Sequence, residues 1–265
     1  MDFFSIITEH ETVTIISLIV ISFTAGFIEA VVGGGGLIQI PGLLILLPKT
    51  SLPTILGTNK IASLTGMSAA AVQYSKRIHF NYKLLLAISV CAGFASFLGA
   101  KMVSYIDVHK IEPFIFVLLI CIATYTFLKK DLGAAQSVYH SITSQFVYGC
   151  LLGLVVGFYD GFLGPGSGSF FVLGFVVILG FEFIKASAYS KVINCITNIS
   201  ALLVFKRQGN YILELAIIMA VCNITGSVIG SKLAMKKGNA FVRSFFLVLL
   251  FIMILRYGYD IFIKK

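Results

Sequence analysis

The sequence predicts an all-α polytopic membrane protein made of two similar halves, and three observations carry that prediction. Hydrophobic residues form 58% of the chain and charged residues only 12%, with a mean hydropathy of +0.99. Apolar runs near the roughly 20 residues that one bilayer crossing needs recur from Thr12 to Ile263. When the sequence is shifted by 131 residues, the first half aligns with the second without gaps, so that position 29 falls on position 160.

The composition predicts one integral membrane domain over residues 1–265 and argues against other classes of protein. Soluble domains are roughly 45–50% apolar and 25% charged, far from the values of this chain. Basic loops that face anionic lipid headgroups explain the net charge of +9, so we expect no nucleic-acid partner. The five cysteines form no CxxC pair and the four histidines lack metal-ligand spacing, so we expect no metal and no cofactor.

The first predicted half, about residues 12–130, opens with an apolar stretch that is too long for one crossing. Thr12 to Leu47 would measure about 54 Å as a straight helix at roughly 1.5 Å per residue, so it must break. Four consecutive glycines, Gly33 to Gly36, and then Pro41 mark the break, because glycine costs about 1 kcal/mol per residue inside a helix. A short segment follows, and later spans are expected at about 52–75, 81–106 and 110–128.

The second predicted half, about residues 143–263, repeats this pattern. A span from Ser144 to Leu163 is followed by "GPGSGS", Gly164 to Ser169, and then by a short segment from Phe170 to Gly180. The remaining spans are expected at about 184–206, 210–235 and 239–263.

The number of crossings in each half decides how the halves are related. Five crossings would invert one half relative to the other, whereas four, with the first two elements merged, would make them parallel. The distribution of Lys and Arg between the loops fits both models equally well. The length of the first apolar stretch favours inverted repeats, within a total of 8 to 10 membrane segments.

Two carboxyl groups occupy equivalent positions, each a few residues before a glycine break. The offset that lays "GFIEAVVGGG" on "GFYDGFLGPG" places Glu29 on Asp160. A charged group at mid-bilayer costs at least about 2.5 kcal/mol, and such groups usually mark ion pathways or proton relays. The alternative is a carboxyl group that stays protonated or caps the broken backbone. Because both halves carry one, we predict that these two residues couple proton binding to transport.

Two lysines form the second symmetric pair. Lys60 in "LGTNKIAS" and Lys191 in "AYSKVINC" lie in the middle of apolar runs, and we predict that they bind an anion. Asn59, Asn194 and Asn198 add hydrogen-bond donors near them, although such residues also join helices to one another. The alternatives for the lysines are ion pairs with the two carboxyl groups, or snorkelling to the membrane interface.

The glycine breaks complete the predicted anion site. Where a short helix restarts, its free backbone N–H groups and positive dipole end face the break. The predicted contacts come from the two breaks: Gly33, Gly34, Gly35, Gly36, Gly164, Gly166 and Ser167. Close helix packing is the competing explanation for glycine in a membrane. We favour that explanation for four others: Gly93, Gly99, Gly226 and Gly230.

The stretches "AGFIEAVVGGGGLIQIPGLL", "TNK" and "VGFYDGFLGPGSGSFFVLGF" resemble the TauE/SafE family of membrane transporters, and closely its YfcA-like branch. The resemblance covers nearly the whole chain. It implies a multi-pass protein of the bacterial plasma membrane that moves small sulfur-containing anions, such as sulfite or organosulfonates, coupled to an ion gradient. The implied partners are a small anion and the lipid bilayer, and a homodimer is an open alternative to a monomer.

The second motif departs from the first, because Gly164, Pro165, Gly166 and Ser167 stand where the first has four glycines. This difference leaves open whether both halves contact a substrate equally. Beside a secondary transporter of small anions, two classes stay open: an anion channel with the breaks as its filter, and an intramembrane enzyme. The enzyme has weak support because the chain has no HExxH, GxSxG or Walker motif and no residue that would activate Ser167. We therefore expect no catalytic residue.

Overall fold

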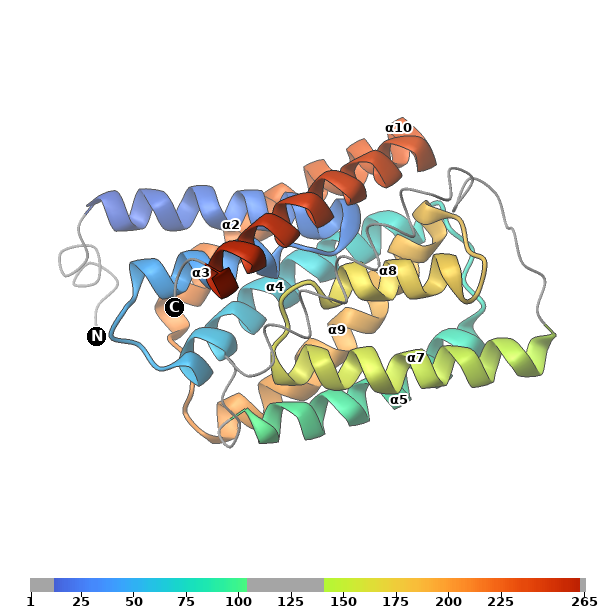
Figure 1. Cartoon of the computed structure of the whole chain (residues 1–265), viewed down its shortest axis with the longest axis horizontal. Helices are drawn as coiled ribbons and strands as arrows, with labels where there is room; N and C mark the ends of the chain where they lie inside the picture. Colours follow the sequence, from blue (N-terminus) through green and yellow to red (C-terminus); the bar gives the residue numbers. More distant parts are fainter. Residues whose placement is uncertain (1–11, 104–140, 263–265) are drawn as a thin grey trace.

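A computed structural model describes residues 12–103 and 141–262, in which helices joined by short turns form the fold and no strand occurs (Figure 1). The helices are α2 (Thr12–Val32), α3 (Gly36–Leu46), α4 (Leu52–Ser75), α5 (Tyr82–Met102), α7 (Ile142–Phe162), α8 (Ser167–Val177), α9 (Phe183–Arg207) and α10 (Leu213–Phe262). The prediction of an all-α protein is confirmed. The span expected at 110–128 lies outside the described residues.

Five of the described helices are long and apolar enough to cross a membrane. These spans are Val13–Val32, Tyr82–Met102, Ile142–Phe162, Phe183–Arg207 and Leu213–Leu249. Helices α3 and α8 are also apolar, but each has only 11 residues, which is too short to cross about 30 Å of hydrocarbon alone. The chain is thus a multi-pass membrane protein that also contains two helices too short to cross the membrane.

The breaks between helices fall where the glycines predict them. Helix α2 ends at Val32 and α3 begins at Gly36, while α8 begins at Ser167, slightly earlier than the expected Phe170. Helix α10 contains a further break at Gly238, which has φ 83° and ψ −173°. That break separates the two spans expected at 210–235 and 239–263, so α10 consists of two helices joined end to end.

Helices α4 and α9 pack against each other in the interior. Helix α4 also contacts α10, α3 and α2, and it buries polar side chains such as Thr58 and Ser63. Polar residues are tolerated in a membrane helix when they face protein rather than lipid. This position explains why α4 spans 24 residues yet is not apolar enough to count among the five long spans.

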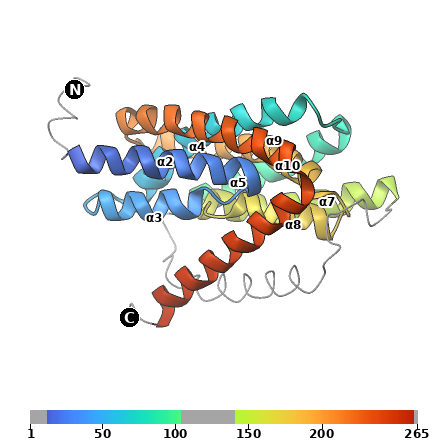
Figure 2. The same ribbon diagram turned by 90° about the horizontal axis from the view of Figure 1, so that it is seen from above.

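The outer helices form two equivalent contacts, each between one half and the other. Helix α5 lies along α7, and α10 packs against α2 (Figures 1 and 2). A Cβ atom added at Gly99 in α5 would overlap the backbone of Phe158 in α7, and one added at Gly230 in α10 would overlap the backbone of Phe27 in α2. Both contacts need glycine so that the helix backbones can approach closely, as expected for these positions.

The direction and spacing of the helices match inverted halves. Helix α7 runs in the opposite direction to α2 (Figures 1 and 2). The offset that relates the halves carries Gly36, where α3 begins, to Ser167, where α8 begins. It likewise carries Leu52, the start of α4, to Phe183, the start of α9. The duplication stays a prediction from the sequence, and these matching bounds support it.

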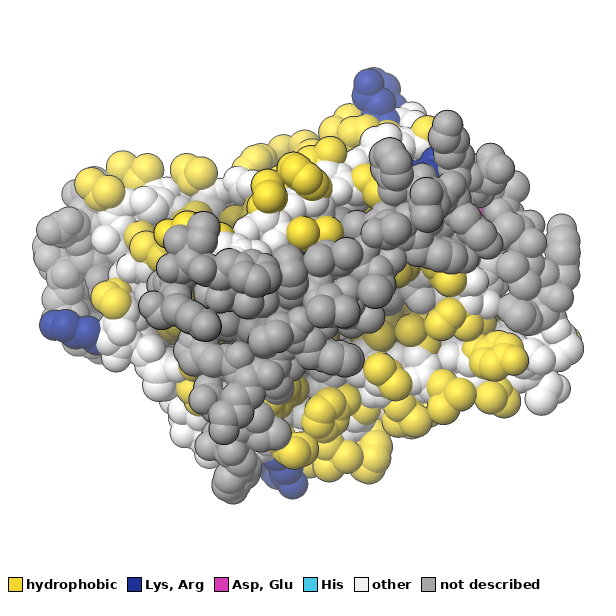
Figure 3. Space-filling view, in the orientation of Figure 1, with side chains coloured by type: hydrophobic (Ala, Val, Ile, Leu, Met, Phe, Trp, Pro, Cys, Tyr) yellow, Lys and Arg dark blue, Asp and Glu magenta, His cyan; other side chains and the backbone are white. Residues whose placement is uncertain are grey.

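Large apolar side chains project from the helices where no other helix packs on them. Val90, Val155 and Val221 are 62%, 71% and 59% exposed. In the space-filling view, hydrophobic side chains spread over the described surface, whereas Lys and Arg lie at its margins (Figure 3). Such a surface is suited to the hydrocarbon of a bilayer, with the cations at the level of the headgroups.

Candidate functional site

The two glycine breaks meet in the interior of the protein. The backbone N–H of Ser169 donates a hydrogen bond to the carbonyl oxygen of Gly33 at 3.0 Å. Gly33 has a φ of +87°, and a Cβ atom there would overlap the backbone of Gly168, so only glycine fits. Helices α3 and α8 begin on either side of this contact and run away from it in opposite directions (Figure 1). Their positive N-terminal ends therefore face one small region.

Four ionisable side chains are buried around these breaks. Glu29 in α2 and Asp160 in α7 lie one turn before the breaks, and Lys60 in α4 and Lys191 in α9 lie opposite them. Each residue is 6% exposed or less. They form two ion pairs, and each pair joins a lysine of one half to a carboxylate of the other. The predicted charged residues are thus brought together across the boundary between the halves.

The ion pair between Lys60 and Asp160 has a full set of hydrogen bonds. Lys60 Nζ lies 2.9 Å from Asp160 Oδ2 and also donates to the backbone carbonyl oxygen of Asp160 at 2.8 Å. The hydroxyl of Ser167 donates to Asp160 Oδ1 at 2.5 Å. Both carboxylate oxygens therefore have a partner, which is what a buried charge requires to be stable.

The ion pair between Lys191 and Glu29 is looser. Lys191 Nζ lies 3.8 Å from Glu29 Oε1, beyond hydrogen-bond distance. The other oxygen, Oε2, accepts a hydrogen bond from the backbone N–H of Gly35 at 2.8 Å. Lys191 Nζ and Glu29 Oε1 are both buried and have no hydrogen-bond partner. A buried charge without hydrogen bonds is costly, so this pair is poised to accept another partner.

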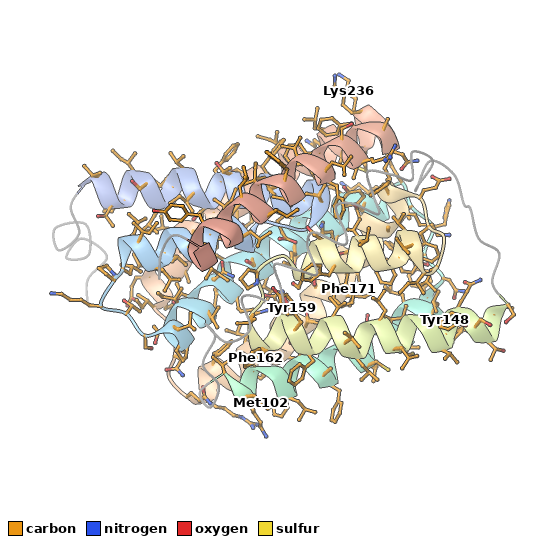
Figure 4. All side chains as sticks on the ribbon, in the orientation of Figure 1. Met102, Tyr148, Tyr159, Phe162, Phe171 and Lys236 are labelled. Carbon is orange, nitrogen blue, oxygen red and sulfur yellow. The ribbon has the colours of Figure 1, made fainter. Side chains whose placement is uncertain are left out.

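Two side-chain hydrogen bonds at the second break have no counterpart at the first. The hydroxyl of Tyr159 donates to the carbonyl oxygen of Pro165 at 2.7 Å, and this side chain lies near the end of α7 (Figure 4). The offset between the halves places Tyr159 on Ile28, which has no hydroxyl group. Ser167 falls on Gly36 in the same way. The first break therefore lacks both side chains that tie down the second.

The predicted asparagines have different roles. The side-chain oxygens of Asn59 and Asn194 are buried without a hydrogen-bond partner, in the residue before Lys60 and one turn after Lys191. Asn198 instead donates to the backbone oxygen of Asn194 at 2.7 Å. The structure therefore places Asn59 and Asn194 near the lysines, while Asn198 is engaged with its own helix.

At each break a carboxylate of the protein accepts a hydrogen bond from the start of the short helix. Glu29 takes the N–H of Gly35 at the start of α3, and Asp160 takes the hydroxyl of Ser167 at the start of α8. Carboxylates at helix N-termini are stabilised by the dipole. Gly36 and Gly164 line the same region: a Cβ atom at Gly36 would lie 3.4 Å from Pro165 Cα, and one at Gly164 would lie 3.5 Å from the Lys60 ammonium group.

Two further predicted glycines shape the breaks without contacting a charge. A Cβ atom at Gly34 would overlap the side chain of Leu249, so this residue packs against α10. Gly166 is the residue that precedes α8 and has a φ of +78°. Only glycine adopts that conformation without strain, so Gly166 sets the angle at which α8 begins.

Several side chains that the sequence did not single out satisfy the last carbonyl groups of α2. The hydroxyls of Tyr74, Ser187 and Ser169 donate to the carbonyl oxygens of Ala30, Val31 and Val32 at 3.0, 3.3 and 3.1 Å. These carbonyls have no partner within the helix because α2 ends there. Ser169 is the last residue of "GPGSGS", and Ser187 immediately precedes "AYSK".

Ser190, which precedes Lys191, connects the second break to α9. Its hydroxyl donates to the carbonyl oxygen of Gly168 at 3.0 Å and accepts from the side-chain amide of Asn194 at 3.3 Å. This chain of contacts fixes α9 against the start of α8. The position of Lys191 is therefore set by the break itself.

A comparison with known families and proteins gives consistent results. Residues 18–257 match the family model described as "Sulfite exporter TauE/SafE". The "Probable membrane transporter protein ORF9" of Sinorhizobium sp is 37% identical over 228 residues, which cover 85% of this chain and 85% of the relative.

Two other relatives match over similar lengths. A "Probable membrane transporter protein" of Haemophilus influenzae is 32% identical over 245 residues, which are 92% of this chain and 94% of the relative. The "Probable membrane transporter protein YfcA" of Escherichia coli is 32% identical over 250 residues, which are 92% and 89% of the two chains. No solved structure matches this chain.

Proposed function

The chain belongs to the TauE/SafE family of membrane transporters, and from this premise we propose that it carries small sulfur-containing anions, such as sulfite or organosulfonates. The observation that carries the proposal is the loose, buried contact between Lys191 and Glu29 at the start of α3. A cation and a helix N-terminus together form an anion site inside the membrane. The named relatives are transporters rather than enzymes.

We propose that, in the absence of substrate, the Glu29 carboxylate occupies the position at which the transported anion binds. It accepts from the N–H of Gly35 and faces Lys191, which are the contacts that a sulfite or sulfonate oxygen would use. The start of α8 is close as well, since a Cβ atom at Gly168 would lie 2.8 Å from Glu29 Oε1. When the substrate binds, its negative charge replaces that of the Glu29 carboxylate.

Proton binding at Glu29 couples to this exchange. A protonated carboxyl group no longer attracts Lys191, so the lysine is released to an incoming anion. By linkage, a bound anion also favours protonation of Glu29, because the two effects are reciprocal. Asp160 is less available for this role since Lys60 and Ser167 occupy both of its oxygens. We therefore propose Glu29 as the principal proton carrier.

Alternating access follows from the fact that both ion pairs cross the boundary between the halves. The charged side chains are 8% exposed or less, which matches an occluded site rather than an open pore. Movement of one half against the other would separate Lys191 from Glu29 more readily than Lys60 from Asp160, because the former pair is 3.8 Å apart and the latter 2.9 Å. An occluded site between two halves that move against each other favours a transporter over a channel.

Flux measurements in proteoliposomes test the proposal. Sulfite, thiosulfate and sulfoacetate are compared with non-sulfur anions of the same charge, with and without a pH gradient. The expected result is saturable uptake of at least one sulfur-containing anion that a pH gradient accelerates. Transport of non-sulfur anions alone would contradict the substrate class, and flux that does not saturate would indicate a channel.

We propose a homodimer as the alternative to a monomeric transporter. The mass of the purified protein in detergent, corrected for bound detergent, distinguishes the two. The site lies between the halves of a single chain, so transport does not require a second copy.

A further inference from the structure

A basic cavity lies at the ends of α4 and of the first part of α10, outside the site described above. Its volume is about 580 Å³, within the range of roughly 300–1,000 Å³ that is usual for small-molecule sites. The described residues that line it are Gln73, Lys76, Arg77, Lys232, Met235 and Lys236. Lys236 lies near the break at Gly238 within α10 (Figure 4).

The described lining contains four cations, one amide and one thioether, but no carboxylate. None of the four cations forms an ion pair with another residue in the described part of the chain. The C-terminal dipole of α4 accounts for Lys76 and Arg77, which follow its last residue. The first part of α10 ends at Gly238, so its dipole accounts for Lys236 in the same way, whereas Lys232 lies more than one turn before that break. Cations that converge from two helices attract an anion.

Apolar side chains lie one helical turn from the cations on both helices. Val72 precedes Lys76 by four residues and is 56% exposed, and Ile229 precedes Lys232 by three residues and is 51% exposed. Residues three or four apart share a helix face. Exposed apolar side chains on the same two helices therefore lie next to the cationic cavity. A ligand that matches both has an anionic head and an apolar tail.

We propose that this cavity binds the phosphate group of an anionic phospholipid, with the acyl chains lying along Val72 and Ile229. Basic pockets between membrane helices bind such headgroups, and each Lys or Arg near an anionic lipid surface strengthens binding about fivefold. Gln73 donates a further hydrogen bond to the phosphate or glycerol oxygens. The same chemistry would accept free phosphate, but only a lipid also uses the apolar surface.

The test compares two variants of the full-length protein that each lose three positive charges. The cavity variant is Lys76→Gln, Arg77→Gln, Lys232→Gln. The matched control is Lys101→Gln, Lys206→Gln, Arg207→Gln, at the ends of α5 and α9, where the offset between the halves places Lys101 on Lys232 and Lys76 on Arg207. Binding of short-chain phosphatidylglycerol, phosphatidylcholine and inorganic phosphate to the detergent-purified proteins is measured by native mass spectrometry.

We expect the wild-type protein and the control to prefer phosphatidylglycerol over phosphatidylcholine, and the cavity variant to bind phosphatidylglycerol at least about tenfold more weakly. Equal losses in both variants would overturn the proposal, because they would show unspecific attraction to surface charge. Unchanged binding in the cavity variant would do the same. Inorganic phosphate that displaces phosphatidylglycerol at equal concentration would show a free-anion site and overturn the assignment to lipid.

Discussion

The two buried ion pairs each join a lysine to a carboxylate, yet only in one of them do both carboxylate oxygens have a hydrogen-bond partner. Lys60 and Asp160 are 2.9 Å apart and every carboxylate oxygen has a hydrogen bond, whereas Lys191 and Glu29 are 3.8 Å apart with unpartnered atoms. The chemical cause is local. The second break supplies the hydroxyl of Ser167, but the first break has only glycine at the equivalent position.

This difference suggests a division of labour between the halves. A complete buried ion pair holds two elements together, and breaking it is costly. An incomplete pair can exchange its partners at little cost. We therefore assign a structural role to the contact between Lys60 and Asp160, and the exchange of anion and proton to the contact between Lys191 and Glu29. The variants below test that assignment.

The largest expected effect on stability is that of Lys60→Met. The substitution leaves the Asp160 carboxylate buried without its cation, which should lower the free energy of unfolding by about 3–5 kcal/mol. Chemical unfolding in detergent measures the loss. The double variant Lys60→Met, Asp160→Asn should recover part of it, because no unpaired charge remains. A single variant as stable as the wild type would show that this pair is not structural.

Lys191→Met should affect binding more than folding. Glu29 keeps its hydrogen bond from Gly35 and can take up a proton, so the loss of stability should be smaller than for Lys60→Met. Substrate affinity should fall at least about tenfold, which corresponds to about 1.4 kcal/mol. Equilibrium binding to the folded variant measures it. Unchanged affinity would leave the lysine with only an ion-pairing role.

The smallest expected effect is that of Gly36→Ser, which gives the first break the hydroxyl group of the second. The position has room, since the nearest atom to an added Cβ is Pro165 Cα at 3.4 Å. A hydroxyl that donates to Glu29 should complete its hydrogen bonds and reduce turnover a few-fold, while stability is kept or increased. Initial uptake rates measure the change. A faster or unchanged rate would argue that the loose contact has no part in transport.

The sequence predicted the breaks at the glycines well because glycine acts locally, whereas Pro41, which was expected to mark the first break as well, lies inside α3. The bounds of α2 and α3, and the break at Gly238, follow from the backbone cost of glycine. The sequence also singled out the four charges that form the two buried ion pairs, because they recur at one spacing. It could not show which lysine meets which carboxylate, since that depends on how the halves pack. Donors such as Tyr74 and Ser187 were missed because their acceptors lie far away in the sequence, on the last turn of α2.

We propose that Glu29, and not Asp160, carries the coupled proton. The most direct test measures accumulation against a gradient and exchange at equal concentrations for Glu29→Gln and Asp160→Asn in proteoliposomes. Because Asp160→Asn leaves Lys60 unpaired, the double variant Lys60→Met, Asp160→Asn is measured beside it. We predict that Glu29→Gln exchanges substrate but does not accumulate it, while the Asp160 variants accumulate with the pH dependence of the wild type. Accumulation by Glu29→Gln with unchanged pH dependence would contradict proton coupling through Glu29. Glu29 would then serve only as a cap for the broken helix.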